Sequence, residues 1–157
     1  MNKMLVSTSS LYRNLEEGCA LVLMGLWVYT AVSKIIDAQG SYGALHNQVF
    51  PGWMADVLWV GLPLIEIIAA IMLLVPSLRR YGFQLSALLM AIFSGYILLV
   101  LTNVFGRVPC SCGGILNQLG WWEHLWFNLF FLGIAVGGIY LGRKSRDLPA
   151  ASRMRET

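Results

Sequence analysis

The sequence predicts an all-α integral membrane protein, a four-helix bundle with both termini in the cytoplasm. The 157 residues are 57% hydrophobic and only 12% charged, whereas about 25% of the residues in an ordinary soluble domain are charged. The apolar residues gather in four segments, each long enough to cross a bilayer core of about 30 Å as a helix. The basic residues lie almost entirely on one side of these segments, which is typical of a membrane protein with a fixed orientation.

The four segments span about residues 18–36, 53–75, 81–103 and 122–141. Helices are expected because backbone polar groups in lipid have to bond within the segment, and the segments lack the alternation of barrel strands. The first segment has the basic start of a signal peptide, but its apolar run is long and no A-x-A-like site follows, so we expect it to be retained. The sequence therefore predicts one transmembrane domain with a basic, disordered cytoplasmic tail at 142–157.

Lysine and arginine define the orientation of the predicted helices. Nine of them lie before the first segment, between the second and third, or after the fourth: Lys3, Arg13, Arg79, Arg80, Arg143, Lys144, Arg146, Arg153 and Arg155. Only Lys34 and Arg107 lie on the other side. Because basic loops stay in the cytoplasm, we expect a multi-pass inner-membrane protein whose loops at 37–52 and 104–121 face the periplasm.

The second outward loop carries "RVPCSCGGIL", which holds two of the three cysteines, Cys110 and Cys112. Disulfides persist in an oxidising compartment. A C-x-C disulfide closes a tight, strained ring, and strained disulfides exchange readily. The proline before the pair and the two glycines after it favour a fixed turn, whose exposed amides could stabilise a thiolate. This pattern favours a reversible redox centre.

Two other interpretations of the cysteine pair stay open. The disulfide could only pin the loop, or the two thiolates could bind a soft metal together with His124 or His46. Four-coordinate zinc needs more ligands than the sequence offers, so no metal-ligating residues are assigned. Cys19 falls near the cytoplasmic end of the first segment, and we expect it to be a small apolar packing residue.

Ionisable residues inside the apolar segments are further candidates. Glu66 lies within the second segment, where a carboxyl group is costly and needs a partner inside the bundle, and Pro63 loosens the backbone one turn before it. Lys34, at the outer end of the first segment, can either extend to the membrane surface or pair with Glu66. The two residues could form a structural polar pair or a proton relay.

His124 and Asn128 share a face at the outer start of the fourth segment. His124 could tune a thiol or pass a proton, or it could belong to an aromatic belt with Trp121, Trp122 and Trp126. The candidate catalytic residues are therefore Cys110, Cys112, Glu66, His124 and Lys34; no cofactor-binding residues are assigned.

Small residues recur at helical spacing in the last two segments. They are Ala87, Ala91 and Gly95 in the third and Gly133, Gly137, Gly138 and Gly142 in the fourth. Such faces allow close helix approach. The approach could be within the bundle, between two copies in a homodimer, or against a membrane partner subunit.

The chain resembles the MauE/DoxX-like redox-associated membrane proteins over about residues 18–141. The stretches that carry the resemblance are "SKIIDA", "VFPGW", "GLPLIEIIAAIMLLV" and "CSCGG" followed by "WWEHLWFNLFFL". Members of the family usually carry C-x-C-F-G in the outer loop. Gly113 stands here in place of the aromatic residue, which changes how a partner or quinone would pack over the pair.

The resemblance implies a membrane redox protein that relays electrons or disulfides through the C-x-C pair, with a periplasmic thioredoxin-like partner. A more distant similarity to quinone-linked four-helix thiol oxidoreductases adds a quinone as the candidate cofactor. The chain could then be a thiol–disulfide oxidoreductase or its accessory subunit. The alternative is a non-catalytic membrane subunit or scaffold whose cysteines form a structural disulfide or a soft-metal site. The expected surroundings are the lipid bilayer, and no nucleic-acid partner is expected.

Overall fold

The computed structural model describes residues 2–106 and 120–153, and the side chains within 10–106 and 120–147. In these ranges all regular structure is helical, in the order α1 (Asn2–Ile36), α2 (Ala38–His46), α3 (Gly52–Leu74), α4 (Arg79–Leu101) and α5 (Trp121–Arg153). Four of these helices are long and apolar enough to cross a membrane, over Ser10–Ile36, Gly52–Leu74, Arg79–Leu101 and Trp121–Asp147. The predicted all-α class and the four membrane-crossing helices are confirmed.

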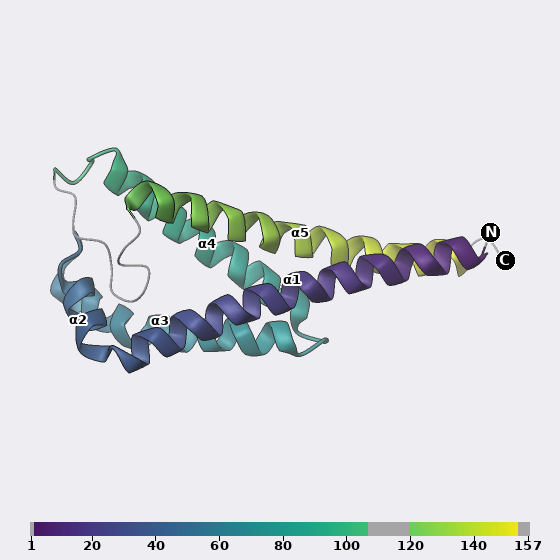
Figure 1. Ribbon diagram of the computed structural model, residues 1–157, viewed down its shortest axis with the longest axis horizontal. Coiled ribbons are helices and arrows are strands. Elements are labelled where there is room, and N and C mark those ends of the chain that lie inside the picture. The colour runs from purple at the N-terminus through teal and green to yellow at the C-terminus, as the bar shows by residue number, and fades with distance from the viewer. Residues whose placement is uncertain (1, 107–119, 154–157) are drawn as a thin grey trace.

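The four long helices form a ring in which each packs mainly against two neighbours. α1 packs against α3 and α5, and α4 packs against the same two helices. α1 therefore lies across the bundle from α4, and α3 lies across it from α5. Successive long helices run in opposite directions, so the two ends of the chain lie together at one end of the bundle and α2 lies at the other (Figure 1).

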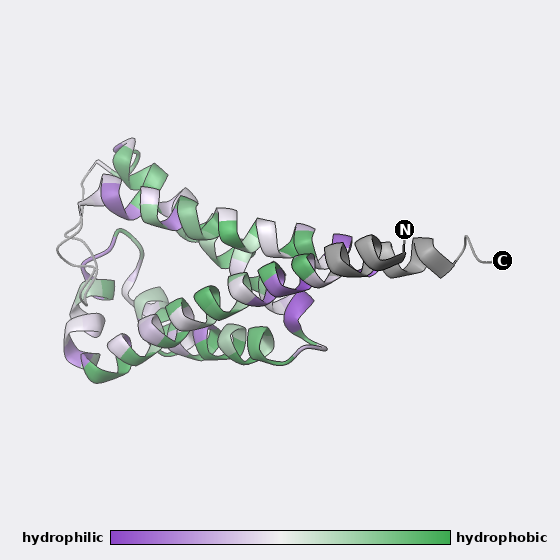
Figure 2. Cartoon of the chain, turned by 45° about the vertical axis from the view of Figure 1, so that its right-hand side comes forward, coloured by the Kyte–Doolittle hydropathy of each residue, from purple (hydrophilic) through white to green (hydrophobic). Residues whose placement is uncertain are grey.

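The long helices of the bundle consist mostly of hydrophobic residues (Figure 2). Large hydrophobic side chains point outward on every long helix, and Ile36, Trp53 and Trp126 are 81%, 68% and 69% exposed. A water-soluble protein rarely exposes contiguous apolar patches of this kind. The chain is therefore a multi-pass membrane protein whose outer face contacts lipid.

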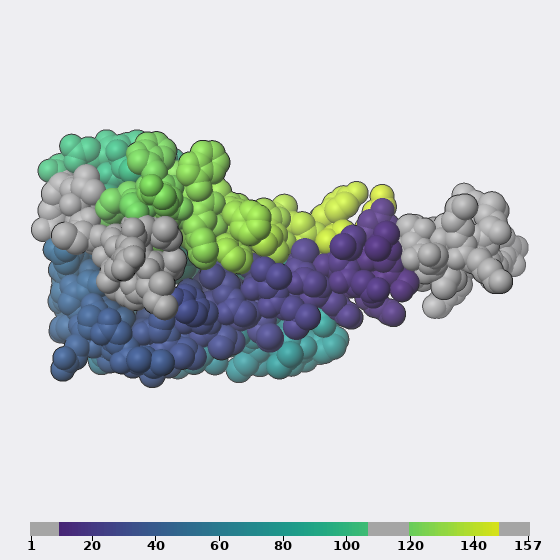
Figure 3. All heavy atoms as spheres, viewed as in Figure 1, coloured from purple at the N-terminus to yellow at the C-terminus, as the bar shows by residue number. Residues whose placement is uncertain are grey.

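The bundle is broad at the α2 end and narrows towards the chain termini (Figure 3). Small residues allow close helix contacts on the way to the narrow end. A Cβ atom on Gly82 would lie 2.8 Å from the backbone nitrogen of Leu73, so α3 and α4 touch at their backbones. A Cβ atom on Gly138 would overlap the buried ring of Phe83, where α4 and α5 cross.

The small-residue faces predicted from the sequence are used only in part for packing within the chain. Gly138 and Gly142 contact other helices of the bundle, against Phe83 and Glu16 respectively. By contrast, an added Cβ atom on Gly95, Gly133 or Gly137 meets nothing within 4 Å. Close packing inside the bundle therefore involves the face of α5 that carries Gly138 and Gly142.

The connection at 37–52 contains a helix that the sequence did not predict, and the expectation of a disordered tail is wrong. In the connection, α2 begins because the Asp37 carboxylate accepts a hydrogen bond from the Gly40 amide, at 3.0 Å, as an N-cap. The tail from 142 is helical as far as Arg153. α5 and α1 lie side by side beyond the ends of α3 and α4, so each helix supports the other there (Figure 1).

Candidate functional site

A cavity of about 170 Å³ lies inside the α2 end of the bundle and is lined by all five helices. Most of its wall is apolar or aromatic, with Leu26, Trp27, Met90, Phe93 and Phe127 among the lining residues. Its polar lining includes Thr30, Lys34, Ser41, Glu66, His124 and Asn128. The cavity brings together three of the predicted site residues, Lys34, Glu66 and His124, from three different helices.

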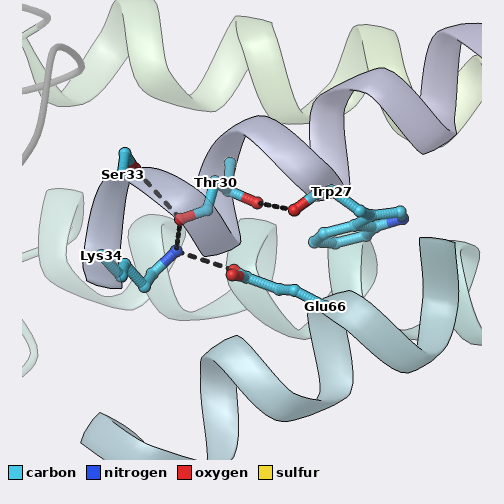
Figure 4. Close-up of polar contacts among 5 residues, drawn as sticks. All are labelled: Trp27, Thr30, Ser33, Lys34 and Glu66. Atoms are coloured by element: carbon cyan, nitrogen blue, oxygen red, sulfur yellow. Dashed lines mark hydrogen bonds and ion pairs between the residues drawn. The ribbon is translucent and has the colours of Figure 1, made fainter. Parts of the chain in front are cut away.

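Lys34 and Glu66 form an ion pair between α1 and α3. The Lys34 ammonium group donates to Oε1 of Glu66 at 2.7 Å, and it also donates to the backbone oxygen of Thr30 at 3.3 Å (Figure 4). Glu66 is only 1% exposed, so its charge needs this partner. Of the two positions expected for Lys34, the structure shows the paired one.

Polar residues of α1 near Lys34 form hydrogen bonds with the backbone of their own helix. Thr30 lies four residues before Lys34, so the two share a face of the helix. The Thr30 hydroxyl donates to the backbone oxygen of Trp27 at 3.1 Å, and the Ser33 hydroxyl donates to that of Thr30 at 3.0 Å (Figure 4). On the other side of the pair, α3 continues through Pro63 to carry Glu66.

Two buried polar atoms of the cavity have no hydrogen-bond partner among the described residues, Oε2 of Glu66 and Nδ2 of Asn128. The Thr30 hydroxyl interacts with the Glu66 carboxylate, but it directs its hydrogen bond to Trp27. Asn128 is 3% exposed. Buried polar groups are nearly always hydrogen-bonded, so two unpartnered atoms in one cavity require an explanation.

α5 contributes its first two turns to the cavity. His124 and Asn128 line it together, and the face that the sequence predicted for them is the one that points inward. Trp122 and Trp126 are 61% and 69% exposed on the outside, as residues of an aromatic belt are. His124 is half-buried, so it belongs to the cavity and not to the outward-facing tryptophans.

α2 closes the end of the cavity with Ser41, Ala44 and Leu45. It is held against α3 by a hydrogen bond of 3.3 Å from the Trp59 indole to the backbone oxygen of Ala38. Further along the chain, the Tyr96 hydroxyl donates to Oε1 of the buried Gln48 at 2.7 Å, which ties the end of α2 to α4.

An aromatic and acidic cluster supports the same contact between α2 and α3. The rings of Tyr42 and Trp59 meet edge to face with centroids 5.4 Å apart, and Nε2 of His46 lies 3.2 Å from the Asp56 carboxylate. The hydrogen bond from Tyr42 to the Asp56 carboxylate raises the pKa of Tyr42. Sequence reasoning missed α2 because a nine-residue helix with two glycines has no clear hydrophobic period.

Trp27 and Ser86 are a second pair that the sequence did not reveal. The buried indole of Trp27 donates to the Ser86 hydroxyl at 2.8 Å, and that hydroxyl donates to the backbone oxygen of Gly82 at 2.8 Å. The pair links α1 to α4 across the bundle, beside the cavity. A serine in an apolar helix and a tryptophan near mid-membrane, away from the belt, were the available signals.

Cys110 and Cys112 lie outside the described residues, so their pairing and chemistry stay predictions. α4 ends and α5 begins at the α2 end of the bundle (Figure 1). Cys19 is half-buried against the core, as expected of a packing residue, and it is a free thiol. In the described ranges, no three His, Cys, Asp or Glu residues lie close enough together to hold a metal ion.

The comparisons with known proteins give one match. A family model described as "Methylamine utilisation protein MauE" matches residues 10–141. The matched region includes the cavity-lining residues and the segment with Cys110 and Cys112. No curated protein and no solved structure matches the chain.

Proposed function

Because the chain belongs to the MauE family of membrane proteins, we propose that it relays disulfides, and the electrons they carry, through Cys110 and Cys112. The observation that carries this proposal is the family match over residues 10–141, which includes the C-x-C segment. The strain of a C-x-C disulfide supports it, because strained disulfides exchange with thiols more readily than structural ones do.

The proposed location is the bacterial inner membrane, with the C-x-C segment on the periplasmic side. An even number of spans leaves both termini on one side, and nine of the eleven basic residues belong to that side. The segment between α4 and α5 then begins and finishes on the opposite, oxidising side, where disulfides persist.

The proposed partner is a thioredoxin-like protein of the periplasm. A thiolate of the partner attacks one sulfur of the Cys110–Cys112 disulfide, and the other cysteine leaves as a thiolate. The partner's second thiolate then attacks the mixed disulfide, which leaves the partner oxidised and both cysteines reduced. The exchange moves two electrons and two protons from the partner to the cysteine pair and so passes a disulfide to the partner. Its reverse passes a disulfide from the partner to the pair. A quinone would accept these electrons and protons.

Lys34, Glu66 and His124 are proposed to hold and pass the protons that accompany the exchange. They line one cavity, at the end of the bundle where α4 ends and α5 begins. A neutral imidazole can accept a proton that a thiol releases, and the ion pair offers a charged group that lines the same cavity. A purely structural ion pair between α1 and α3 is the alternative for Lys34 and Glu66.

Single cysteine variants test the proposal. In Cys110→Ser or Cys112→Ser, the remaining thiol has no neighbour to resolve the mixed disulfide, so one of the two variants should accumulate a covalent adduct with its partner. The adduct is seen as a larger species on a non-reducing gel, and mass spectrometry identifies the linked peptide. Cys19→Ser is the matched control, because Cys19 packs in the core and its loss should leave the adducts unchanged.

The double variant Cys110→Ser/Cys112→Ser completes the test. It should form no adduct and should lose function in cells while its helical content is unchanged. If neither single variant forms an adduct and the double variant keeps full function, the cysteines only fix the loop. The chain is then a non-catalytic membrane subunit or scaffold.

A further inference from the structure

His46, in the last turn of α2, has an oxygen atom facing each of its two ring nitrogens. Nδ1 lies 3.0 Å from the backbone oxygen of Tyr42, and Nε2 lies 3.2 Å from Oδ1 of Asp56 on α3. A carbonyl oxygen only accepts hydrogen bonds, so Nδ1 carries a hydrogen. A neutral imidazole has one N–H group, and its Nε2 would then turn a lone pair towards the carboxylate. Only the imidazolium ion has an N–H group for both oxygens.

We infer that His46 is a pH-sensitive switch between α2 and α3, which holds α2 in place when the imidazole is protonated and releases it when the imidazole is neutral. α2 supplies Ser41, Ala44 and Leu45 to the end wall of the cavity. Its release therefore opens that end of the cavity. The switch involves no cysteine, so the inference does not rest on the proposed relay.

The surroundings of His46 favour its positive charge. Besides the Asp56 carboxylate, the ring of Tyr42 lies against the imidazole with centroids 4.0 Å apart, and an aromatic ring attracts a cation at such a distance. His46 is also the basic residue of the last turn of α2, and the carbonyl groups at the C-terminal end of a helix attract positive charge. Three independent contacts thus act in the same direction.

The imidazole is the group of this contact that changes charge between pH 5 and 8. In the described part of the chain, the titratable groups that face it are Asp56 from α3 and Tyr42 from its own helix. Tyr42 stays protonated in this range, because its hydrogen bond to the Asp56 carboxylate raises its pKa. Lys34 on the neighbouring α1 pairs with Glu66 instead.

α2 is a helix that a weak contact can hold or release. It has nine residues, and an isolated helix shorter than about 12–15 residues is marginal in water. Its other contacts with α3 include the Trp59 indole, which donates to the backbone oxygen of Ala38 at 3.3 Å. The side chains of His46 and Asp56 are 30% and 58% exposed, so water screens their attraction. A pair of this kind changes an equilibrium by up to about fivefold.

Hydrogen–deuterium exchange of the full chain in lipid nanodiscs tests the switch. Mass spectrometry measures the exchange of peptides from α2 at about pH 5.5 and about pH 8, on either side of the titration of a histidine, with correction for the intrinsic rate at each pH. We expect the protection of α2 to fall about three- to fivefold towards the higher pH, because the attraction to Asp56 is lost when the imidazole becomes neutral. The protection of α4 should stay constant.

Three variants assign the effect to this contact. His46→Gln removes the titrating ring, so the protection of α2 should be the same at both pH values. Asp56→Asn supplies an amide that can donate to the neutral ring, so the pH dependence should disappear or reverse. The chain has two histidines, and His124→Gln is the matched control that should keep the dependence of the native chain. Circular dichroism confirms that each variant is folded; if either His46→Gln or Asp56→Asn does not fold, the other tests the same contact.

The inference is overturned if the protection of α2 in the native chain does not change with pH, or if His46→Gln or Asp56→Asn keeps the native dependence. Loss of the dependence in His124→Gln would assign the titration to the other histidine and would overturn it as well. Cys110→Ser/Cys112→Ser should keep the dependence, so the relay and the switch can fail separately.

Discussion

Lys34 and Glu66 show how one ion pair can join two membrane helices and form one wall of a cavity. One carboxylate oxygen of Glu66 pairs with Lys34, whose side chain is 26% exposed, and the other oxygen is buried without a hydrogen-bond partner among the described residues. Removing one member of a buried ion pair leaves the other charge without a partner, which lowers the free energy of unfolding by about 3–5 kcal/mol when the pair is fully buried. The partial exposure of Lys34 lowers this cost.

Substitution of one member of the pair should therefore destabilise the protein. We expect Lys34→Met to lower the free energy of unfolding by about 2–4 kcal/mol, because it strands the charge of Glu66. Glu66→Ala should have a similar effect and Glu66→Gln a smaller one. Thermal or denaturant unfolding of the purified chain in detergent measures the differences.

The double variant Lys34→Met/Glu66→Gln is the control for this prediction. It removes both charges together, so it should recover most of the stability lost in Lys34→Met. If all the single variants were as stable as the native chain, the structural role of the ion pair would be contradicted. Stable single variants that also function normally in cells would contradict its proton-relay role as well.

At the residue scale, the sequence indicates which polar side chains lie inside the bundle where a polar group interrupts an apolar segment. Glu66 and Lys34 are expected to pair because charges at bilayer depth are costly, and His124 and Asn128 share a face because they are four residues apart; all four line the cavity, and their functional roles stay predictions. Ser41 was missed because it lies on a helix that the sequence did not predict. The Trp27–Ser86 hydrogen bond was missed because helix rotation decides which side chains meet across a bundle, and periodicity alone does not determine that rotation.

The helices approach one another most closely where glycine or another small residue removes the side chain. Gly82 allows α4 to contact the backbone of α3, and Gly138 receives the ring of Phe83. Gly137 is adjacent in sequence but has open space at the Cβ position. Neighbouring glycines on α5 therefore differ in their surroundings.

This difference gives a matched prediction. Gly138→Ala forces the Phe83 ring to move within a packed core, and overpacking of this kind costs about 1–3 kcal/mol. Gly137→Ala meets no neighbour and gains helix propensity of up to about 1 kcal/mol. In detergent, Gly138→Ala should therefore have a lower free energy of unfolding than the native chain, and Gly137→Ala should have an equal or higher one. Equal stability would mean that α5 does not pack against Phe83 as described.

The extent of the helices could be predicted only for the membrane-crossing segments. Apolar length sets those segments, and their predicted bounds differ from α3 and α4 by a few residues. α1 has 35 residues and a length of about 50 Å, which exceeds a bilayer core of about 30 Å. Its extension and that of α5 depend on their contact with each other, which no single segment encodes. α2 depends on one cap at Asp37 and on tertiary contacts with α3 and α4.

At the scale of the whole molecule, the bundle is narrow at the end with the chain termini and broad at the α2 end. The narrow end has the glycine contacts. The broad end has the cavity of about 170 Å³ and the ends of α4 and α5 that flank the cysteine segment. A relay between a periplasmic partner and the bilayer requires the broad end to face outward. Orientation is therefore the property on which the proposed function depends most.

Reporter fusions test this orientation. Nine basic residues on one side against two on the other predict cytoplasmic termini. A fluorescent protein that folds in the cytoplasm should be bright when fused after residue 157, and alkaline phosphatase at the same position should be inactive. Phosphatase inserted between residues 106 and 120 should be active. Active phosphatase at the C-terminus would reverse the topology and put the cysteines in a reducing compartment.

The central claim is that Cys110 and Cys112 cycle between disulfide and dithiol in the living cell. Growing cells are quenched with acid, free thiols are alkylated with one isotopic label, and thiols released by reduction are alkylated with a second. Mass spectrometry then gives the oxidised fraction of the cysteine-pair peptide, with the Cys19 peptide as an internal standard that should stay reduced. We expect both states of the pair to be populated, with both cysteines changing together and shifting towards the dithiol when respiration stops. A pair that stays wholly oxidised or wholly reduced in both conditions would contradict the relay.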